Sequence, residues 1–277
     1  MTFPTAAMLD DPDFVPLTRR TITEQLRHLG VAAGDVLMVH VRLSALGWVV
    51  GGIDTVVHAL QDAVGSRGTL LAFCGWDDSP YHVKFWPDRW QRAYDDLPAF
   101  DPAVSSARRD FGRFPERLRT WPGAQRSSHP EVSFAAVGPH TTALLTDVPD
   151  PWGADGPLGR LVALDGRVLL LGAPLRTLTL CHHAEAIADV QGKRYHSYRM
   201  PVRTPAGTEW RNYRTLDTFY GSLPYGIDHP TAVLADQAVR AGAATSATVG
   251  PATSWLFNAR RTVAAATQWL EQTFNNA

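Results

Sequence analysis

The chain has 277 residues, 45% of them hydrophobic, so it can bury one large core or two modest ones. Its 26 Lys and Arg residues nearly balance 27 Asp and Glu residues, and the formal charge of -1 argues against a general affinity for nucleic acid or an anionic membrane. Two cysteines, Cys74 and Cys181, are too few for a disulfide framework and indicate buried thiols. We see neither a run of about 18 apolar residues nor a charged leader, and therefore expect a cytoplasmic protein.

Residues 1–16 are rich in Pro and Asp and predict a flexible arm, followed by a single domain over 17–277. The first helix should begin near Thr18 and Thr21, with Glu24 as a capping-box acid. The elements expected along the domain are a helix over 17–29, a strand over 36–40, a helix capped by Asp54 and ending at Val64, a strand over 68–74, a helix over 111–119, strands over 132–137 and 167–171, a helix over 179–190, antiparallel strands within 194–218, strands over 245–250 and 254–257, and a helix over 258–274.

One long segment, residues 75–110, interrupts this alternation because it mixes Trp and Tyr with Asp and Pro. Long loops of this kind usually close over a ligand or bind it. The alternation elsewhere predicts an α/β fold, with a mixed central β-sheet covered by helices and an antiparallel C-terminal portion.

The most informative stretch is an apolar strand over 167–171 that leads through Gly172 and Pro174 into a predicted helix. On that helix His182 and Glu185 are three residues apart, so their side chains are surface neighbours. A carboxylate that accepts a hydrogen bond from one ring nitrogen fixes the tautomer and leaves the other nitrogen to take a proton. The pair therefore has the makings of an oriented general base.

Several alternatives compete with this interpretation. A His–Glu pair by itself is more often structural than catalytic. Cys181 is adjacent to His182, but neighbours on a helix point about 100° apart, so a Cys/His nucleophile is the weaker idea. His183 fits a lining or structural role, and the acyl-transfer pattern His-His-x-x-x-Asp fails because position 187 is Ile187. A metal site would require more ligands than the two histidines and Glu185 supply.

Five ordered motifs together resemble the aminoglycoside 3-N-acetyltransferases, the antibiotic N-acetyltransferase family. The resemblance spans residues 18–274. The motifs are Met38–Gly52, Phe100–Ala103, Arg126–Gly138, Leu169–Glu185 and Val249–Phe257.

The resemblance implies the fold of that family and direct transfer of an acetyl group from acetyl-CoA, without a metal or an acyl-enzyme, to the 3-amino group of a 2-deoxystreptamine antibiotic. Such a reaction inactivates the drug and confers resistance. The matching residues make His182 the general base and Glu185 the group that holds it. Thr179 would position the thioester or donate to the developing oxyanion, although helix capping would also explain it.

The implied acetyl-CoA site contains hydroxyls, backbone amides and cations that suit phosphates and pantetheine amides. Arg42 departs from the family, which usually has Ser or Thr there, and a charged contact to phosphate would replace the hydroxyl. A structural role for His40 and a surface position for Arg126 are the alternatives. The predicted site comprises His40, Val41, Arg42, Leu43, Arg126, Ser127, Ser128 and Ser133.

The implied acceptor is a polycation, which carboxylates attract and aromatic faces can stack against. The predicted acceptor site comprises Trp76, Asp77, Asp78, Tyr81, Glu185 and Asp189. We expect the chain to act as a monomer or homodimer on this small molecule, without nucleic acid or membrane. Two alternatives remain. One is an enzyme of the same fold that acetylates another amine, and the other is a metal-dependent hydrolase that uses His182, His183, Glu185 and another acid.

Overall fold

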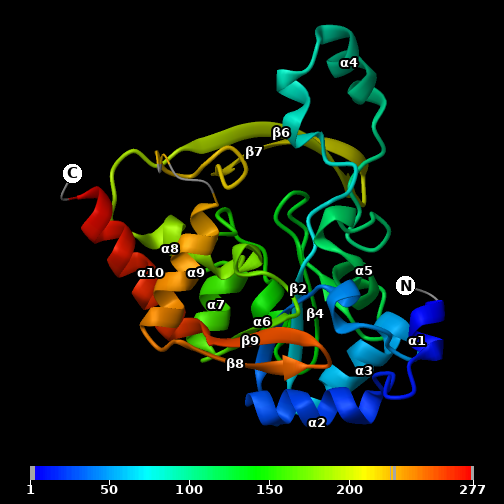
Figure 1. The fold of residues 1–277 in the computed structure, drawn as a ribbon. Helices are drawn as coiled ribbons and strands as arrows, with labels where there is room; N and C mark the ends of the chain where they lie inside the picture. The colour runs from blue at the N-terminus through cyan, green and yellow to red at the C-terminus, as the bar shows by residue number, and fades with distance from the viewer. Residues whose placement is uncertain (1–3, 225, 227–228, 276–277) are drawn as a thin grey trace.

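A seven-stranded mixed sheet forms the centre of the computed structural model, which describes residues 4–224, 226 and 229–275 (Figure 1). The strand order is β3-β4-β2-β1-β5-β9-β8. β1 pairs in parallel with β2 and β5, and the other neighbours are antiparallel, so the predicted mixed sheet with an antiparallel C-terminal portion is confirmed. The strands are β1 (Val36–Val41), β2 (Thr69–Phe73), β3 (Gln125–Arg126), β4 (Phe134–Val137), β5 (Arg167–Leu171), β8 (Ala244–Val249) and β9 (Ala252–Asn258).

Helices cover both faces of this sheet because successive strand side chains point to opposite sides. Along β1, Leu37 and Val39 pack into a cluster with residues of α2, α3 and α5, whereas Met38 packs against α8 and α10. None of the described helices combines the length and apolar character needed to cross a bilayer. The covering helices are α2 (Arg19–Leu29), α3 (Gly52–Val64), α5 (Arg113–Arg119), α6 (Thr141–Leu145), α7 (Pro157–Ala163), α8 (Leu180–Ile187), α9 (Pro230–Arg240) and α10 (Ala259–Phe274).

A separate two-stranded ribbon, β6 (Tyr195–Thr204) with β7 (Gly207–Leu216), arches beside the segment that carries α4 (Asp88–Ala93) (Figure 1). The predicted antiparallel pair within 194–218 is thus confirmed. The ribbon buries Tyr198, Met200 and Val202 against aromatic residues of the 75–110 segment. That segment is therefore packed, and it contains short 3-10 turns at Pro80–Phe85 and Tyr94–Asp96 in addition to α4.

Two predicted helix starts were wrong in detail. The capping box of α2 joins Thr18 to Thr21, and Glu24 takes no part in it. α3 begins earlier than expected, with Gly51 at the N-cap position, and Asp54 instead pairs with Arg117 at 2.6 Å. The helices α6, α7 and α9 were not predicted, nor was the short α1 (Ala6–Asp10) within the expected flexible arm.

The connection from β5 to the helix α8 turns sharply at Gly172. Its φ of +64° lies in the left-handed region, where a side chain is strained. A Cβ added there would also come within 3.1 Å of the Cβ atoms of Ala45 and Ala252. Because Gly172 N–H donates to Ser254 Oγ at 3.1 Å, the turn is held in place by the neighbouring strand β9.

We expect Gly172→Ala to destabilise the protein more than Gly34→Ala does. Both positions have positive φ, but a Cβ at Gly34 would have no atom within 4 Å, so that variant reports the backbone cost alone. Backbone strain should cost about 1 kcal/mol in either variant, and crowding should add to it only at Gly172. Urea unfolding measures the loss in free energy of unfolding for each variant. Equal losses would contradict a destabilising effect of crowding at Gly172.

Candidate active site

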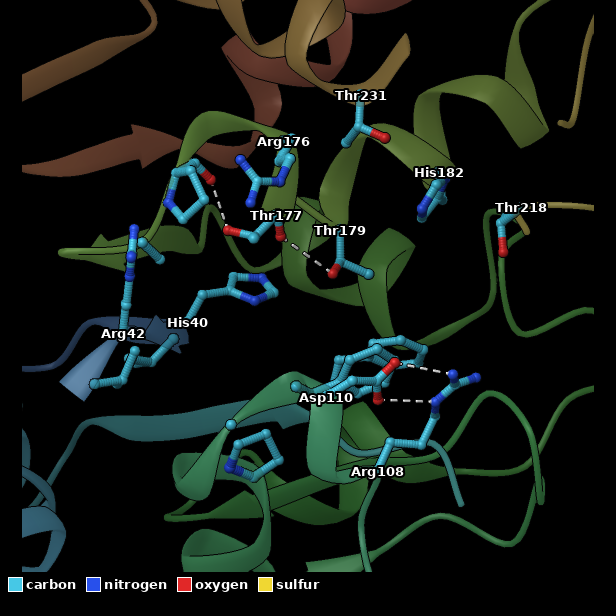
Figure 2. Close-up of a pocket in the computed structure, with 18 of the residues that line it drawn as sticks. His40, Arg42, Arg108, Asp110, Arg176, Thr177, Thr179, His182, Thr218 and Thr231 are labelled. Carbon is cyan, nitrogen blue, oxygen red and sulfur yellow. Dashed lines mark hydrogen bonds and ion pairs between the residues drawn. The ribbon is translucent and has the colours of Figure 1, made fainter. Parts of the chain in front are cut away.

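A cavity of about 650 Å³ opens where the parallel strands β1 and β5 end, as is common for ligand sites in α/β sheets (Figure 2). Its wall combines the segment after β1, the segment that follows Gly172 and the turn at Arg109–Phe111. Figure 2 shows Arg42 and Arg176 toward the end occupied by His40, with His182 and Thr218 toward the other end. The cavity therefore joins cationic side chains to the predicted base.

His182 and Glu185 form the predicted pair on α8. The distance between His182 Nδ1 and Glu185 Oε2 is 2.7 Å, and the carboxylate is almost completely buried, at 1% exposure. Since a carboxylate accepts hydrogen bonds, Nδ1 carries the hydrogen and Nε2 is left as the proton acceptor of the ring. His182 lines the cavity with its ring against Trp152, at a centroid distance of 5.3 Å. This geometry is what a general base requires.

Thr179 lines the cavity one helical turn before His182, and neither Thr179 nor Thr177 caps α8 with its side chain. The Thr177 hydroxyl donates to the Pro174 carbonyl at 2.7 Å. Among the described residues, the Thr179 hydroxyl has one hydrogen-bond partner, the Thr177 carbonyl at 3.5 Å, which is a weak interaction. Helix capping therefore does not account for Thr179, whose hydroxyl is available to a ligand.

The adjacent His183 and Cys181 are buried in the core. His183 Nδ1 donates to the Trp152 carbonyl at 2.8 Å, and burial lowers its pKa. Burial also raises the pKa of the Cys181 thiol, which keeps it protonated. His182 and His183 thus direct their Nδ1 atoms to different partners, and among the described residues no three His, Cys, Asp or Glu side chains are grouped as a metal site.

Four of the residues predicted to bind acetyl-CoA, namely His40, Val41, Arg42 and Leu43, line the cavity. Arg113 and Arg176 line it as well and are exposed, as Arg42 is. Neither of these two arginines was predicted to bind the cofactor, because the sequence around each one is that of an ordinary surface residue.

The other four predicted cofactor residues are not among those that line this cavity. Arg126 donates through Nε to Ser133 Oγ at 3.0 Å and through its two Nη atoms to the Ser105 and Gly75 carbonyls. Burial lowers its pKa to about 10. Ser133 is fully buried and donates to the same Gly75 carbonyl at 3.0 Å. Arg126 and Ser133 therefore tie loops together.

Ser127 and Ser128 belong to the same structural block. Ser127 Oγ accepts a hydrogen bond from the Phe134 amide at 3.0 Å, and the Ser128 amide donates to Asp147 at 3.2 Å. Both serines line a second, smaller cavity of about 150 Å³. A run of Arg and Ser looks alike in sequence whether it faces a phosphate or a backbone carbonyl, since both are hydrogen-bond acceptors.

Of the predicted acceptor residues, only Tyr81 lines the large cavity. Trp76 is buried in the cluster beneath the β6–β7 ribbon, and Asp77 accepts hydrogen bonds from the Arg109 amide at 3.0 Å and from its Nε at 2.5 Å. Asp78 and Asp189 are exposed and lie elsewhere. Glu185 is buried behind His182, so its carboxylate serves the histidine and does not face the cavity.

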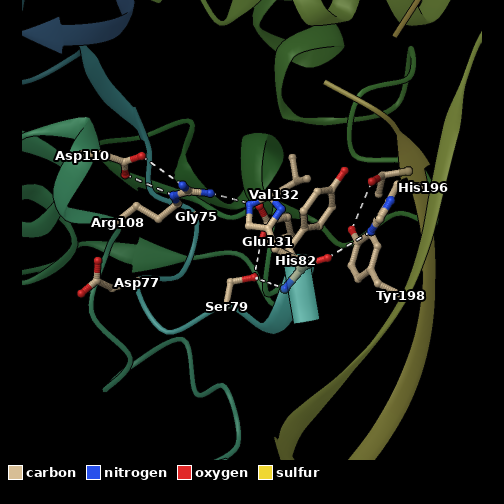
Figure 3. Close-up of polar contacts among 12 residues, drawn as sticks. Gly75, Asp77, Ser79, His82, Arg108, Asp110, Glu131, Val132, His196 and Tyr198 are labelled. Atoms are coloured by element: carbon tan, nitrogen blue, oxygen red, sulfur yellow. Dashed lines mark hydrogen bonds and ion pairs between the residues drawn. The ribbon is translucent and has the colours of Figure 1, made fainter. Parts of the chain in front are cut away.

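Two acidic residues of the cavity wall, Asp110 and Glu131, were missed (Figure 3). Arg108 lies between them, 3.0 Å from Asp110 and 3.4 Å from Glu131. Ser79 also donates to Glu131, and burial raises the pKa of this carboxyl. Glu131 follows the Arg126–Pro130 motif by one residue, which is the one signal in the sequence that could have drawn attention to it.

We expect Arg126→Gln to lower the free energy of unfolding by about 3 kcal/mol, because it removes charge-assisted hydrogen bonds and leaves buried carbonyls unpaired. Arg176→Gln is the matched control, since Arg176 is exposed at the cavity and should change stability by less than about 0.5 kcal/mol. Urea unfolding followed by circular dichroism tests both variants. Equal stability of the two would contradict the structural role of Arg126.

Comparison with known proteins identifies the family. The family described as aminoglycoside 3-N-acetyltransferase matches residues 38–271. Aminoglycoside N(3)-acetyltransferase VIII of Streptomyces fradiae is 47% identical over 271 residues, which are 95% of this chain and 94% of that protein. AAC-IIIb in a binary complex with CoASH superposes with a TM-score of 0.87 at 38% identity, covering 94% of this chain and 98% of that one.

A solved structure of AAC-VIa bound to sisomicin is also similar, with a TM-score of 0.86 and 34% identity. The alignment covers 94% of this chain and 99% of that one. The chain is thus similar to known acetyltransferases over nearly its whole length. This similarity accompanies the order of the motifs, the fold and the His182–Glu185 pair. The chain belongs to the aminoglycoside 3-N-acetyltransferase family.

Proposed function

We propose that this protein transfers the acetyl group of acetyl-CoA directly to the 3-amino group of a 2-deoxystreptamine aminoglycoside, with His182 as general base. The observation that carries the proposal is the 2.7 Å contact between His182 and buried Glu185, on the wall of a cavity that also contains unpaired arginines. The ligands bound in two similar structures, CoASH in AAC-IIIb and sisomicin in AAC-VIa, support the two substrates.

An aliphatic amine is mostly ammonium at neutral pH, so it must lose one proton before it can attack and a second one as the amide forms; the second proton is the one that needs a base. One proton leaves for solvent, and the nitrogen lone pair then attacks the thioester carbonyl carbon. His182 Nε2 takes the second nitrogen proton, while Glu185 stabilises the imidazolium that forms. When the carbon–sulfur bond breaks, the CoA thiolate takes that proton. The products are the amide and CoASH, and one proton has been released.

Cationic groups at the His40 end of the cavity suit the phosphates of acetyl-CoA. Arg42 and Arg176 are exposed there, and neither forms an ion pair with another described residue. An unpaired guanidinium can make two parallel hydrogen bonds to a phosphate. We therefore place Arg42, where the family usually has Ser or Thr, in cofactor binding, as predicted from the sequence.

The acceptor is proposed to lie against Tyr81, Asp110 and Glu131. These side chains line the same cavity as His182, and carboxylates attract a polycation. Thr179 is proposed to position the thioester, because its hydroxyl has only a weak partner in the fold. A cytoplasmic location, the absence of a metal requirement and a monomeric or homodimeric state remain predictions from the sequence.

We expect His182→Ala to lower kcat by about 10²–10⁴-fold, because the reaction loses its general base. Thiol release from acetyl-CoA is measured with gentamicin, neomycin or apramycin, with and without EDTA, and NMR of the product locates the acetyl group. His28→Ala is the control, since His28 is exposed on α2. Absence of drug-dependent release by the wild type would overturn the proposal, and sensitivity to EDTA would favour a metal-dependent hydrolase.

We expect Arg176→Ala to raise the KM for acetyl-CoA about tenfold while leaving the KM for S-acetylpantetheine unchanged. The smaller thioester lacks the phosphates that a guanidinium would bind, and one charge-assisted contact contributes about 1.5 kcal/mol. Arg89→Ala serves as control because Arg89 is exposed on α4 and lies outside the described cavity lining. Equal changes for both thioesters would show that Arg176 does not contact phosphate.

A further inference from the structure

The alternation of β1 places His40 on the same face of the sheet as the catalytic helix. His40 pairs with Leu170 of β5, two residues before Gly172. It shares a face with Met38, which packs in one cluster with Leu170 and with Cys181 of α8. The imidazole therefore emerges at the carboxyl end of β1, on the side where α8 carries His182.

The surroundings of the His40 ring differ from those of His182. His40 lines the cavity, and its Nε2 is shielded from water without a hydrogen-bond partner among the described residues. Burial lowers its pKa to about 4, with no carboxylate to oppose that shift, so the ring is neutral at pH 7. Figure 2 shows the ring beside Thr177 and Thr179, between Arg42 and His182 in that view.

A buried polar nitrogen without a partner costs about 1–3 kcal/mol unless a ligand satisfies it. Attack on a thioester requires a hydrogen-bond donor, because negative charge develops on the carbonyl oxygen and must be stabilised. A neutral imidazole has one N–H group, which can donate this hydrogen bond while the ring keeps its proton. The nearby Thr177 hydroxyl cannot substitute, since it already donates to the Pro174 carbonyl.

We propose that His40 is a further catalytic residue, whose neutral imidazole donates an N–H hydrogen bond to the carbonyl oxygen of the acetyl thioester. This inference rests on the proposed acetyl transfer. As the amine attacks, the carbonyl π electron pair moves to oxygen and His40 stabilises that charge while keeping its proton. The C=O bond then re-forms, and the electron pair of the carbon–sulfur bond leaves with sulfur. The electrophilic role of His40 thus complements the proton-accepting role of His182.

The decisive experiment is isotope-edited infrared spectroscopy of S-[1-¹³C]acetyl-CoA bound to the enzyme without acceptor. A donated hydrogen bond weakens the C=O bond, so its stretching frequency should be lower on the wild type than on His40→Phe. His40→Gln retains an N–H donor and should restore part of the shift. His28→Gln, the control on α2, should match the wild type. A merely structural histidine would leave the carbonyl frequency of bound acetyl-CoA unchanged.

Steady-state kinetics supply the second measurement. His40→Phe should lower kcat by about 10²–10³-fold, the usual effect of losing one oxyanion donor. The KM for acetyl-CoA should change by less than about threefold, because the hydrogen bond strengthens mainly as charge develops in the transition state. Unchanged kcat and carbonyl frequency in His40→Phe would overturn the inference.

The outcomes also separate this inference from the proposed function. A wild-type enzyme that releases no thiol with any aminoglycoside would refute the proposed acceptor, whereas the infrared shift would still report on His40. An active wild type with no shift would refute the role of His40 alone. If His40→Phe fails to fold, His40→Leu carries the test, because leucine also lacks a donor, and wild-type kcat with an unchanged carbonyl frequency in His40→Leu counts against the inference.

Discussion

The parallel pairing of β1 with β5 is the constraint on which the rest of the site depends. Five consecutive pairs, from Leu37 with Arg167 to Val41 with Leu171, align the ends of both strands. A shift by one residue would turn His40 into the opposite core, because strand side chains alternate between faces. The same shift would move Gly172, and with it the start of the segment that leads to α8. Register in the sheet therefore sets the relative positions of the two histidines.

Burial decides which arginines are open to a ligand. Arg126 is surrounded by carbonyls and the Ser133 hydroxyl, which use its donors, and its charge is held inside the protein. Arg42 and Arg176 have the same chemistry but lie exposed at the cavity. Burial also determines the partners of the acidic residue Glu131. Its carboxyl group is buried and is paired with Arg108 and Ser79. Electrostatic function in this fold follows from solvent access as much as from residue type.

The sequence was sufficient wherever the information is local. Periodicity predicted the central strands, and the spacing of His182 and Glu185 predicted their contact, because an i,i+3 pair on a helix meets without help from the rest of the fold. Contacts between segments that are distant in the sequence could not be predicted. Asp77 was assigned to the acceptor, yet Arg109, brought close by the fold, occupies its carboxylate. Glu131 was missed because its place on the cavity wall depends on loops that a single sequence does not position.

The two histidines illustrate how neighbours assign roles to one side chain. His182 has a buried carboxylate at 2.7 Å, so an imidazolium formed in the proposed proton transfer would be stabilised where it arises. The His40 ring is desolvated and has no such partner among the described residues, so a positive charge on it is disfavoured. Acetyl transfer to an amine needs both functions at once, one for the nitrogen proton and one for the carbonyl oxygen. A site with two carboxylate-paired histidines would carry two competing bases, whereas under the proposed mechanism the paired histidine would accept the proton and the unpaired one would stabilise the oxygen.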